Sequence, residues 1–464
     1  MLLVNQESRY TMFIVLLTSF VVPFMGSAVV LAVPAIGAQY GSNALWLSWV
    51  VLAYILSSAA FLLPFGRMAD LIGRRVVFIW GLALFTVSTF LCCISWSIES
   101  LLLFRFLQGV GSSAMFSTGM AILTLAFTPQ ERGKMLGFNA AAVYVGLSAG
   151  PFVGGILNLQ FGWPSIFLLT ALLSLPVTIL AFKVLQTDPV ETGKDARFDW
   201  ISAVLYSAGL GMLLCGISAI AEYGFTAVII GVSGALLLFL FILRQCEVEQ
   251  PMIDIKLFAS NTVFAFSNLA SLINYSATFA VSFILAIHLQ HIMGFNSQIA
   301  GLIMISQPIL MAIISPFAGT LSDRISPQIV ASWGMGLTAA GLGLFVFITQ
   351  DTPIWFIGAN LALLGVGFAL FASPNNNAIM SSVDRQHYGI AGSTMGTMRL
   401  VGQAASMALA TLIINYYIGS VEVKLADPDM LIRSFKTIFS IFTVACICGI
   451  FASLARGKNS KLEV

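Results

Sequence analysis

Uncharged apolar segments long enough to cross a lipid bilayer dominate this chain. Between Tyr10 and Gly66 there is no Asp, Glu, Lys, Arg or His, and similar uncharged runs cover 135–182 and 292–322. An α-helix crosses the hydrocarbon core with about 20 apolar residues, whereas membrane-barrel strands alternate in polarity over about ten. The runs here are continuous, so the sequence predicts an all-α integral membrane protein that lies in the lipid bilayer.

The composition excludes the main soluble classes. Of the 464 residues, 59% are hydrophobic and 9% are charged, whereas soluble domains carry about 25% charged residues. A net charge of +2 argues against a nucleic-acid partner, which a strongly basic surface would attract. The six Cys have no metal-ligand or disulfide spacing. With three His and no acid–nucleophile cluster, we predict no enzyme, no metal and no cofactor.

Turn residues and charges divide the apolar runs into fourteen predicted transmembrane helices. The clusters Gly41–Asn43 and Phe161–Pro164 mark hairpins inside the two longest runs. The N-terminal run is too long for a cleaved signal peptide, so we expect it to remain as the first span. The spans are expected at 11–36, 45–65, 76–95, 100–127, 135–160, 163–184, 200–221, 224–244, 262–288, 297–318, 328–349, 353–373, 389–418 and 436–455.

The basic residues orient these spans. If both termini are cytoplasmic, most of the 21 Lys and Arg residues fall on the cytoplasmic side, and only Lys424, Arg433 and Lys436 fall outside. Such an excess of cytoplasmic Lys and Arg is the general rule for helical membrane proteins. We therefore predict a multi-pass protein of the cell (plasma) membrane with both termini in the cytoplasm.

The cytoplasmic loops repeat. One G-x-x-x-D turn ends at Asp70 and another ends at Asp323, and Arg132 and Arg385 follow these acids at equal distances along the chain. The pattern predicts two copies of a six-helix unit with two inserted helices. A carboxylate at one helix end and an arginine at another can form a latch that breaks between conformations. Alternatively, these residues are solvated loop charges.

The repeat divides the chain into three parts. We expect an N-terminal six-helix bundle at 1–185, linkers with two inserted helices at 186–258, and a C-terminal six-helix bundle at 259–464.

Four segments carry motifs. The loop Gly66–Arg75 reads G-x-x-x-D-x-x-G-R-R, Gly146–Gly155 reads G-x-x-x-G-P-x-x-G-G, and Leu103–Gly109 and Phe198–Trp200 add weaker matches. These segments resemble the major facilitator superfamily, and specifically its fourteen-helix drug:proton antiporters. The resemblance implies a monomer that exports amphipathic or hydrophobic small molecules by alternating access, in exchange for protons.

The glycines of the fifth predicted span form a smooth stripe. Gly146, Gly150 and Gly154 recur every four positions, and Pro151 removes a backbone donor among them. Small residues let another helix approach closely, so we predict a gating interface; generic tight packing is the alternative. The predicted latch and gating residues are Gly66, Asp70, Gly73, Arg74, Arg75, Arg132, Asp323, Arg385, Gly146, Gly150, Pro151 and Gly154.

Two arginines fall inside predicted spans. A charge within a span is costly unless it faces the bundle interior or water. We predict a coupling or gating role for Arg105, with capping of carbonyl groups as the alternative. Arg399 lies about midway through its span and is expected to face the substrate cavity, where it would take an anionic or carbonyl-bearing partner.

The acids depart from the antiporter pattern. The resemblance places an acid in the first span, where this chain has Met25, and no carboxylate lies near the middle of any predicted span. Besides Arg105, the remaining candidates for proton coupling are Glu222, the pair of Asp70 with Arg132, and His288. For the histidine, a polar position at the aqueous interface is the alternative.

Uncharged polar residues are available for the substrate instead. Many Phe, Met and Trp residues accompany them, which suits a large, adaptable apolar cavity. Alternatives to multidrug export are transport of one metabolite or lipid-like compound without protons, and a membrane receptor that does not transport. The predicted cavity residues are Met25, Gln108, Asn139, Tyr144, Asn274, Gln307, Asn360 and Arg399.

Overall fold

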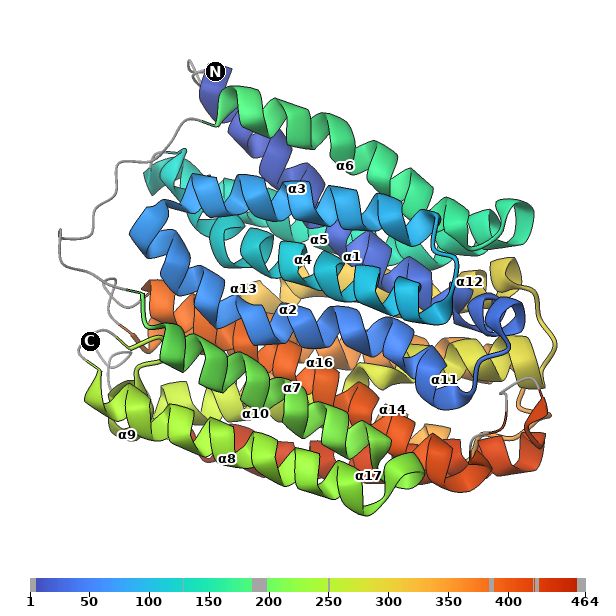
Figure 1. The fold of residues 1–464 in the computed structure, drawn as a ribbon. Helices are drawn as coiled ribbons and strands as arrows, with labels where there is room; N and C mark the ends of the chain where they lie inside the picture. Colours follow the sequence, from blue (N-terminus) through green and yellow to red (C-terminus); the bar gives the residue numbers. More distant parts are fainter. Residues whose placement is uncertain are drawn as a thin grey trace.

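The computed structural model describes residues 6–127, 129–185, 198–248, 251–383, 388–419, 421 and 425–456, and leaves out the side chains of residues 6–7, 44, 129–134, 136, 323 and 388–390. These ranges consist mainly of helices joined by short connections (Figure 1). The first six are α1 (Gln6–Tyr40), α2 (Ala44–Ile72), α3 (Arg74–Cys93), α4 (Ile98–Leu125), α5 (Pro129–Phe161) and α6 (Pro164–Val184). A hairpin and a short helix follow: α7 (Trp200–Tyr223), α8 (Phe225–Glu247) and α9 (Ile255–Ser260). The last group is α10 (Thr262–Thr278), α11 (Ala280–Ile287), the π-helical turn η1 (His288–Ile292), α12 (Ser297–Met304), α13 (Ser306–Arg324), α14 (Pro327–Phe345), α15 (Ile354–Ser381), α16 (Tyr388–Ile418) and α17 (Pro428–Leu454).

Thirteen helical segments in the described ranges are long and apolar enough to cross a membrane. They match thirteen of the fourteen predicted spans, because α10, α11 and η1 form one segment and α12 and α13 form another. The remaining helix, α4, has 28 residues but is less apolar, since it carries Glu99, Arg105 and Gln108. Length and hydropathy therefore do not confirm the predicted number of fourteen.

The chain runs up and down the bundle, and α1 begins at the same end as α17 finishes (Figure 1). We call this the terminal end and the opposite one the distal end. The two predicted distal hairpins are confirmed: α1 ends at Tyr40 and α2 begins at Ala44, while Gly162 separates α5 from α6. Gly41 and Gly162 have φ of 59° and 77°, a backbone conformation that glycine adopts without steric cost.

The two six-helix groups pack in the same order. In the first, α1 lies against α5 and α6, α4 lies against α2 and α3, and α3 contacts α6. In the second, α10 lies against α16 and α17, α15 lies against α13 and α14, and α14 contacts α17. This is the order that a duplicated unit produces. We call the two groups the first half and the second half.

Close helix crossings recur at matching positions in the two halves. A Cβ added at Gly81 would lie 2.9 Å from the carbonyl oxygen of Gly111, and one added at Gly334 would lie 2.6 Å from that of Gly367. Gly81 and Gly334 also occupy matching places after the two G-x-x-x-D turns. Any side chain there would force α3 from α4, or α14 from α15.

The inserted hairpin covers one seam between the halves. Helix α7 lies against both α2 and α16 and pairs with α8 (Figure 1). The Tyr206 hydroxyl group donates to the carbonyl oxygen of Ala59 at 3.0 Å, and the Ser207 hydroxyl group donates to that of Ala60 at 2.7 Å. The hairpin is therefore attached to α2 by hydrogen bonds as well as by packing.

Candidate functional site

Arg399 of α16 lies where the two halves meet. Its guanidinium carbon is 5.6 Å from the centre of the Phe116 ring, which α4 of the first half supplies. It also interacts with the hydroxyl group of Tyr275 on α10. An arginine over an aromatic face is attracted by the negative face of the ring. The contact therefore links the two halves through a cation–π interaction.

Further polar and aromatic side chains surround this arginine. The rings of Tyr275 and Phe368 meet edge to face, with 5.2 Å between their centres. Tyr144 of α5 lies near Tyr275, and its hydroxyl group accepts a 3.0 Å hydrogen bond from Ser315 of α13. We call the whole set the central cluster: Phe116, Tyr144, Tyr275, Ser315, Phe368 and Arg399.

The central cluster is only partly enclosed. Its members come from the interiors of six long helices, two in the first half and four in the second. All of them except Ser315 are half-buried rather than buried. A small molecule held between the halves would therefore contact a guanidinium group, two phenol groups and two phenyl rings.

Among the described residues, no acid balances the charge of Arg399. No described carboxylate forms an ion pair with it, and no other described contact of Arg399 supplies a negative charge. A charged side chain within a membrane-spanning helix is costly without an anionic or carbonyl partner. Within the described part of the chain, the central cluster therefore carries one positive charge and no negative one.

Arg105 has a different environment. It is 1% exposed, and its Nε donates to the carbonyl oxygen of Val50 at 2.9 Å. One terminal nitrogen donates to Gln108 at 2.6 Å, and the guanidinium carbon lies 4.5 Å from the centre of the Tyr54 ring. These partners all belong to the first half. This geometry agrees with the alternative role for Arg105, in which its guanidinium group caps a backbone carbonyl group.

Several residues expected in a cavity pack within one half instead. Met25 is buried, and its sulfur accepts a hydrogen bond from Thr170 at 3.2 Å. The Gln108 amide bonds Thr89 as well as Arg105, and Asn139 accepts a hydrogen bond from Ser19. Buried Asn360 donates to the carbonyl oxygen of Gly341 at 2.9 Å. The sequence did not reveal these partners, because all of them except Arg105 lie on another helix.

The second half contains buried amide groups that no described residue hydrogen-bonds. Asn274, Asn375 and Asn415 are at most 5% exposed, and neither side-chain polar atom of any of them is bonded to a described residue. A buried polar group left unbonded costs about 1–3 kcal/mol. Such groups require water or a bound molecule. Gln307 of α13, another expected cavity residue, is half-buried.

The glycine stripe packs inside the first half. A Cβ added at Gly146 would lie 2.4 Å from the carbonyl oxygen of Phe20, and one added at Gly154 would lie 2.7 Å from the Cβ of Ala28. A Cβ at Gly150 would lie 1.8 Å from the Ser27 hydroxyl oxygen. Since Phe20, Ser27 and Ala28 all belong to α1, the stripe joins α5 to a helix of its own half.

The contact between halves uses the neighbouring face of α5. A Cβ at Gly301 of α12 would lie 2.1 Å from the carbonyl oxygen of Pro151, and one at Gly155 would lie 2.5 Å from that of Ser297. Ser297 also donates to the carbonyl oxygen of Gly155 at 3.0 Å. Of the predicted gating residues in α5, Pro151 thus contacts the opposite half directly. This contact closes the distal end between α5 and α12.

The predicted latch is described only in part. Gly73 has φ of 104° between α2 and α3, which explains a glycine at this place. Next to it, Arg74 approaches Asp70 at 3.4 Å across the turn. The neighbouring Gly66 and Arg75 lie in α2 and α3. The side chains of Arg132 and Asp323, and the whole of Arg385, lie outside the described residues.

We expect Asp70→Asn to lower the transport rate about fivefold, because one partly exposed ion pair changes an equilibrium by about that factor. The latch hypothesis assigns this loss to the conformational cycle, so substrate affinity should not change. Initial rates and binding in proteoliposomes measure the two effects. Asp351→Asn, in the exposed loop before α15, serves as control. An unchanged rate in Asp70→Asn would contradict the latch.

The other proposed coupling residues lie away from the central cluster. Glu222 is exposed at the distal end of α7. His288 opens the π-helical turn η1 and is fully buried, with its ring edge to face against Phe435 of α17 at 6.3 Å. Neither of its ring nitrogens is bonded to a described residue. The alternative placed His288 at an aqueous interface; in the structure the ring is buried and contacts Phe435.

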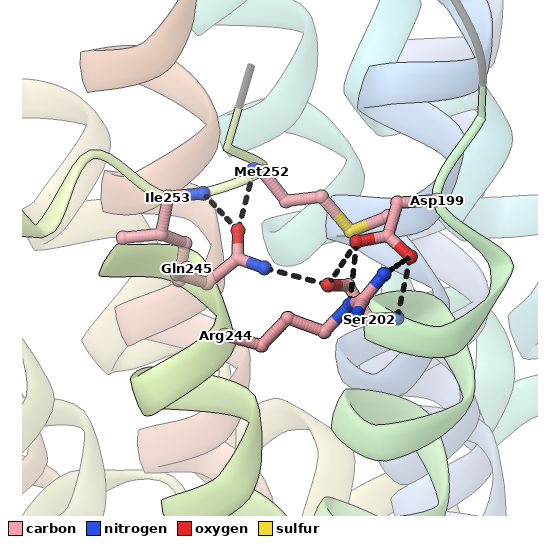
Figure 2. A network of polar contacts seen from close by, with 6 residues as sticks. All are labelled: Asp199, Ser202, Arg244, Gln245, Met252 and Ile253. Atoms are coloured by element: carbon pink, nitrogen blue, oxygen red, sulfur yellow. Dashed lines mark hydrogen bonds and ion pairs between the residues drawn. The ribbon is translucent and has the colours of Figure 1, made fainter. Parts of the chain in front are cut away.

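A polar network fixes the terminal end of the inserted hairpin (Figure 2). Asp199 caps α7 and receives two hydrogen bonds from Arg244 of α8, at 2.9 and 3.0 Å. Gln245 donates to Ser202 at 2.8 Å, and its carbonyl oxygen accepts the backbone N–H of Met252 at 2.6 Å. The network holds the start of α7, the end of α8 and the connection to α9 together.

Asp199→Asn is expected to destabilise the fold by about 1–2 kcal/mol at neutral pH. Burial alone would raise the pKa of Asp199, but hydrogen bonds from Arg244 and Ser202 outweigh it and lower the pKa from 3.8 to about 2. A depressed carboxyl pKa stabilises the folded state above the unfolded pKa, and this contribution disappears as the pH falls toward 2. Thermal unfolding at pH 7 and pH 3 measures it.

The difference between wild type and Asp199→Asn should be roughly halved at pH 3. Asp351→Asn, an exposed acid in the loop before α15, is the control. A difference that is equal at both pH values would show that the ion pair does not cause it.

Sequence reasoning found Arg399 and Tyr144 but missed Phe116, Ser315 and Phe368. Nothing in the spacing of these three residues distinguishes them from the many Phe and Ser residues of other spans. They can be recognised as site residues only in the folded structure, where they gather around the charged side chain of Arg399.

Comparisons with known proteins agree with this architecture. The family model described as Major Facilitator Superfamily matches residues 15–245 and 268–462. The riboflavin transporter RibZ of Clostridioides difficile (strain 630) is 32% identical over 383 residues, which cover 82% of this chain and 83% of the relative. The cephamycin export protein CmcT of Amycolatopsis lactamdurans is 30% identical over 399 residues, 84% and 82% of the two chains.

A solved structure with the same fold is a bacterial homolog of the human lysosomal transporter Spinster, in an inward-facing and unoccupied conformation. It aligns with a TM-score of 0.70 at 14% identity and covers 97% of this chain and 98% of that chain. At this identity the likeness concerns the fold alone.

Proposed function

Because this chain belongs to the Major Facilitator Superfamily, whose members are membrane transporters and not enzymes, we propose that it moves small molecules with an anionic or carbonyl group by alternating access. The substrate binds in the central cluster, and Arg399 recognises its negative or carbonyl oxygen. The single observation that carries this proposal is the guanidinium group between the halves with no described acid beside it.

The charge of the central cluster argues for this class of substrate. A cationic drug would meet an uncompensated positive charge in surroundings of low dielectric constant, where like charges repel strongly. A carboxylate or carbonyl oxygen would instead accept charge-assisted hydrogen bonds from the guanidinium group. The proposal narrows the expected amphipathic or hydrophobic substrates to anionic and carbonyl-bearing ones.

The rings of the central cluster favour planar, aromatic substrates. Phe116, Tyr144, Tyr275 and Phe368 offer faces and edges for stacking. The unbonded amide group of Asn274, which precedes Tyr275 in the chain, offers a neutral hydrogen-bonding partner. A relative of this chain is named a riboflavin transporter. A flavin combines a planar ring with carbonyl oxygens, so transport of a flavin-like compound is the more specific form of the proposal.

The proposal includes an orientation. We place the terminal end in the cytoplasm because Lys and Arg concentrate in its loops, and we count α4 as the fourteenth span because it packs between α2 and α3. The first half (1–185), the inserted part (186–258) and the second half (259–464) then form one monomeric transporter of the plasma membrane.

Proteoliposomes containing the purified protein test the substrate class, with riboflavin as one probe and the cation ethidium as the other. We expect saturable riboflavin flux and no ethidium flux above that of empty liposomes. Ethidium flux without riboflavin flux would overturn the proposal, and no flux of either probe would favour a receptor without transport.

Export of drugs in exchange for protons is the second candidate. It is supported by the relative that is named a cephamycin export protein and by the antiporter motif in α5. In the described part of the chain, the central cluster contains no carboxylate that could carry the proton. A pH gradient across the same proteoliposomes decides: flux that follows the gradient supports proton exchange, and flux independent of it supports the first candidate.

A further inference from the structure

Arg456 is a second arginine with no acid beside it among the described residues, far from the central cluster. It follows α17 at the terminal end and is 1% exposed. None of its three guanidinium nitrogens is hydrogen-bonded to a described residue. Burial lowers the pKa of Arg456 to about 10, so the group stays charged at neutral pH. An unpaired buried charge is destabilising until an anion pairs with it.

The acceptors closest to Arg456 along α17 are already occupied. Gln328 of α14 donates to the carbonyl oxygen of Leu454, and Thr262 of α10 donates to the carbonyl oxygen of Arg456 itself at 3.4 Å. The hydroxyl groups of Ser332 and Ser453 bond each other at 2.8 Å. These bonds join α10, α14 and α17 around the end of α17. None of them involves the guanidinium group of Arg456.

The depth of this site in the membrane points to the ligand. Helix α17 has 27 residues, so it is about 40 Å long, and its ends extend beyond a hydrocarbon core of about 30 Å. Next to the bonded pair Ser332 and Ser453, Trp333 and Phe451 are 73% and 68% exposed. Exposed aromatic rings at a helix end mark the level of the lipid headgroups. Phosphate groups of lipids lie at this level.

We propose that Arg456 binds a phosphate-bearing anion at the terminal end of the second half, and that the anion is the headgroup of a lipid whose chains contact Trp333 and Phe451. Arginine suits this role because its planar fork forms paired hydrogen bonds with phosphate oxygens. To reach the headgroup, its long side chain has to turn outward from its buried position, as arginine side chains do near membrane surfaces. The site is independent of the transported substrate.

Thermal unfolding of the full-length protein in detergent tests this site. Phosphatidylglycerol should raise the apparent Tm of the wild type by about 3 °C or more, whereas diacylglycerol, which lacks the phosphate, should not. Arg456→Gln should lose at least half of this increase. Arg433→Gln, an exposed arginine near the other end of α17, should keep it.

Two further arms complete the experiment. Arg456→Lys retains the charge without the fork, so it should give an intermediate increase and it serves where Arg456→Gln does not fold. An equal increase from inorganic phosphate alone would support the anion site and overturn the lipid as its source. An increase of the same size in Arg456→Gln, or none in the wild type, would overturn the proposal.

Discussion

Replacing Arg399 by glutamine is expected to lower the substrate affinity about ten- to a hundredfold and to reduce flux in proportion. The guanidinium group would contribute charge-assisted hydrogen bonds to an anionic or carbonyl oxygen, and such bonds contribute about 1.5–3 kcal/mol. Glutamine keeps a donor of similar polarity but loses the charge. Binding of riboflavin to the purified protein and its flux in proteoliposomes measure the effect.

Two controls separate recognition from folding. Arg399→Lys keeps the charge but presents a single ammonium group, so it should retain part of the affinity. Arg433→Gln removes an exposed arginine from α17 and should leave flux unchanged. Wild-type flux in Arg399→Gln would show that the substrate binds elsewhere.

Replacing Gly301 by leucine is expected to keep the distal end open and to reduce flux at least about tenfold. A Cβ at this position would lie 2.1 Å from the backbone carbonyl oxygen of Pro151, which cannot move aside as a flexible side chain does. A penalty of about 1.4 kcal/mol on the closed state already changes its population tenfold. The cycle would then lack one of the two states that alternating access requires.

Spin labels at Leu159 and Ile299 measure the state directly. Both residues are exposed near the distal ends of α5 and α12, and the distance between them should lengthen in Gly301→Leu. Gly358→Ala in α15 is the control, because no atom lies within 4 Å of a Cβ built there. An unchanged distance with normal flux would show that this contact does not gate transport.

The two arginines inside membrane-spanning helices, Arg105 and Arg399, show how far sequence reasoning reaches. Arg105 and Arg399 both interrupt apolar helices. The sequence predicts a coupling or gating role for Arg105, with carbonyl capping as the alternative, and a place in the substrate cavity for Arg399. The structure separates them. Arg105 is bonded to Val50 and Gln108 inside the first half, whereas Arg399 faces Phe116 of the other half. Which helix lies opposite a side chain is a long-range property that local spacing does not contain.

The glycine stripe makes the same point. A repeat of four positions predicts a smooth face and a close helix neighbour, and Gly146, Gly150 and Gly154 have one. The neighbour is α1 of the same half, and Pro151 on the adjacent face meets the second half at Gly301. The spacing could not choose between these faces, because both carry small residues.

The sequence by itself determined that the chain lies in a lipid bilayer, that its apolar runs form helices and that a six-helix unit occurs twice. The bilayer leaves no water to bond the backbone, so long uncharged runs must form helices, and their turns follow from local glycine and asparagine conformations. The tertiary structure decided which polar groups are used in packing and which remain free for a ligand. Hydrogen bonds such as those of Arg105 satisfy a buried charge within one half. That no described acid pairs with Arg399, and that no described group bonds the guanidinium group of Arg456, emerges only when helices distant in the chain are packed together.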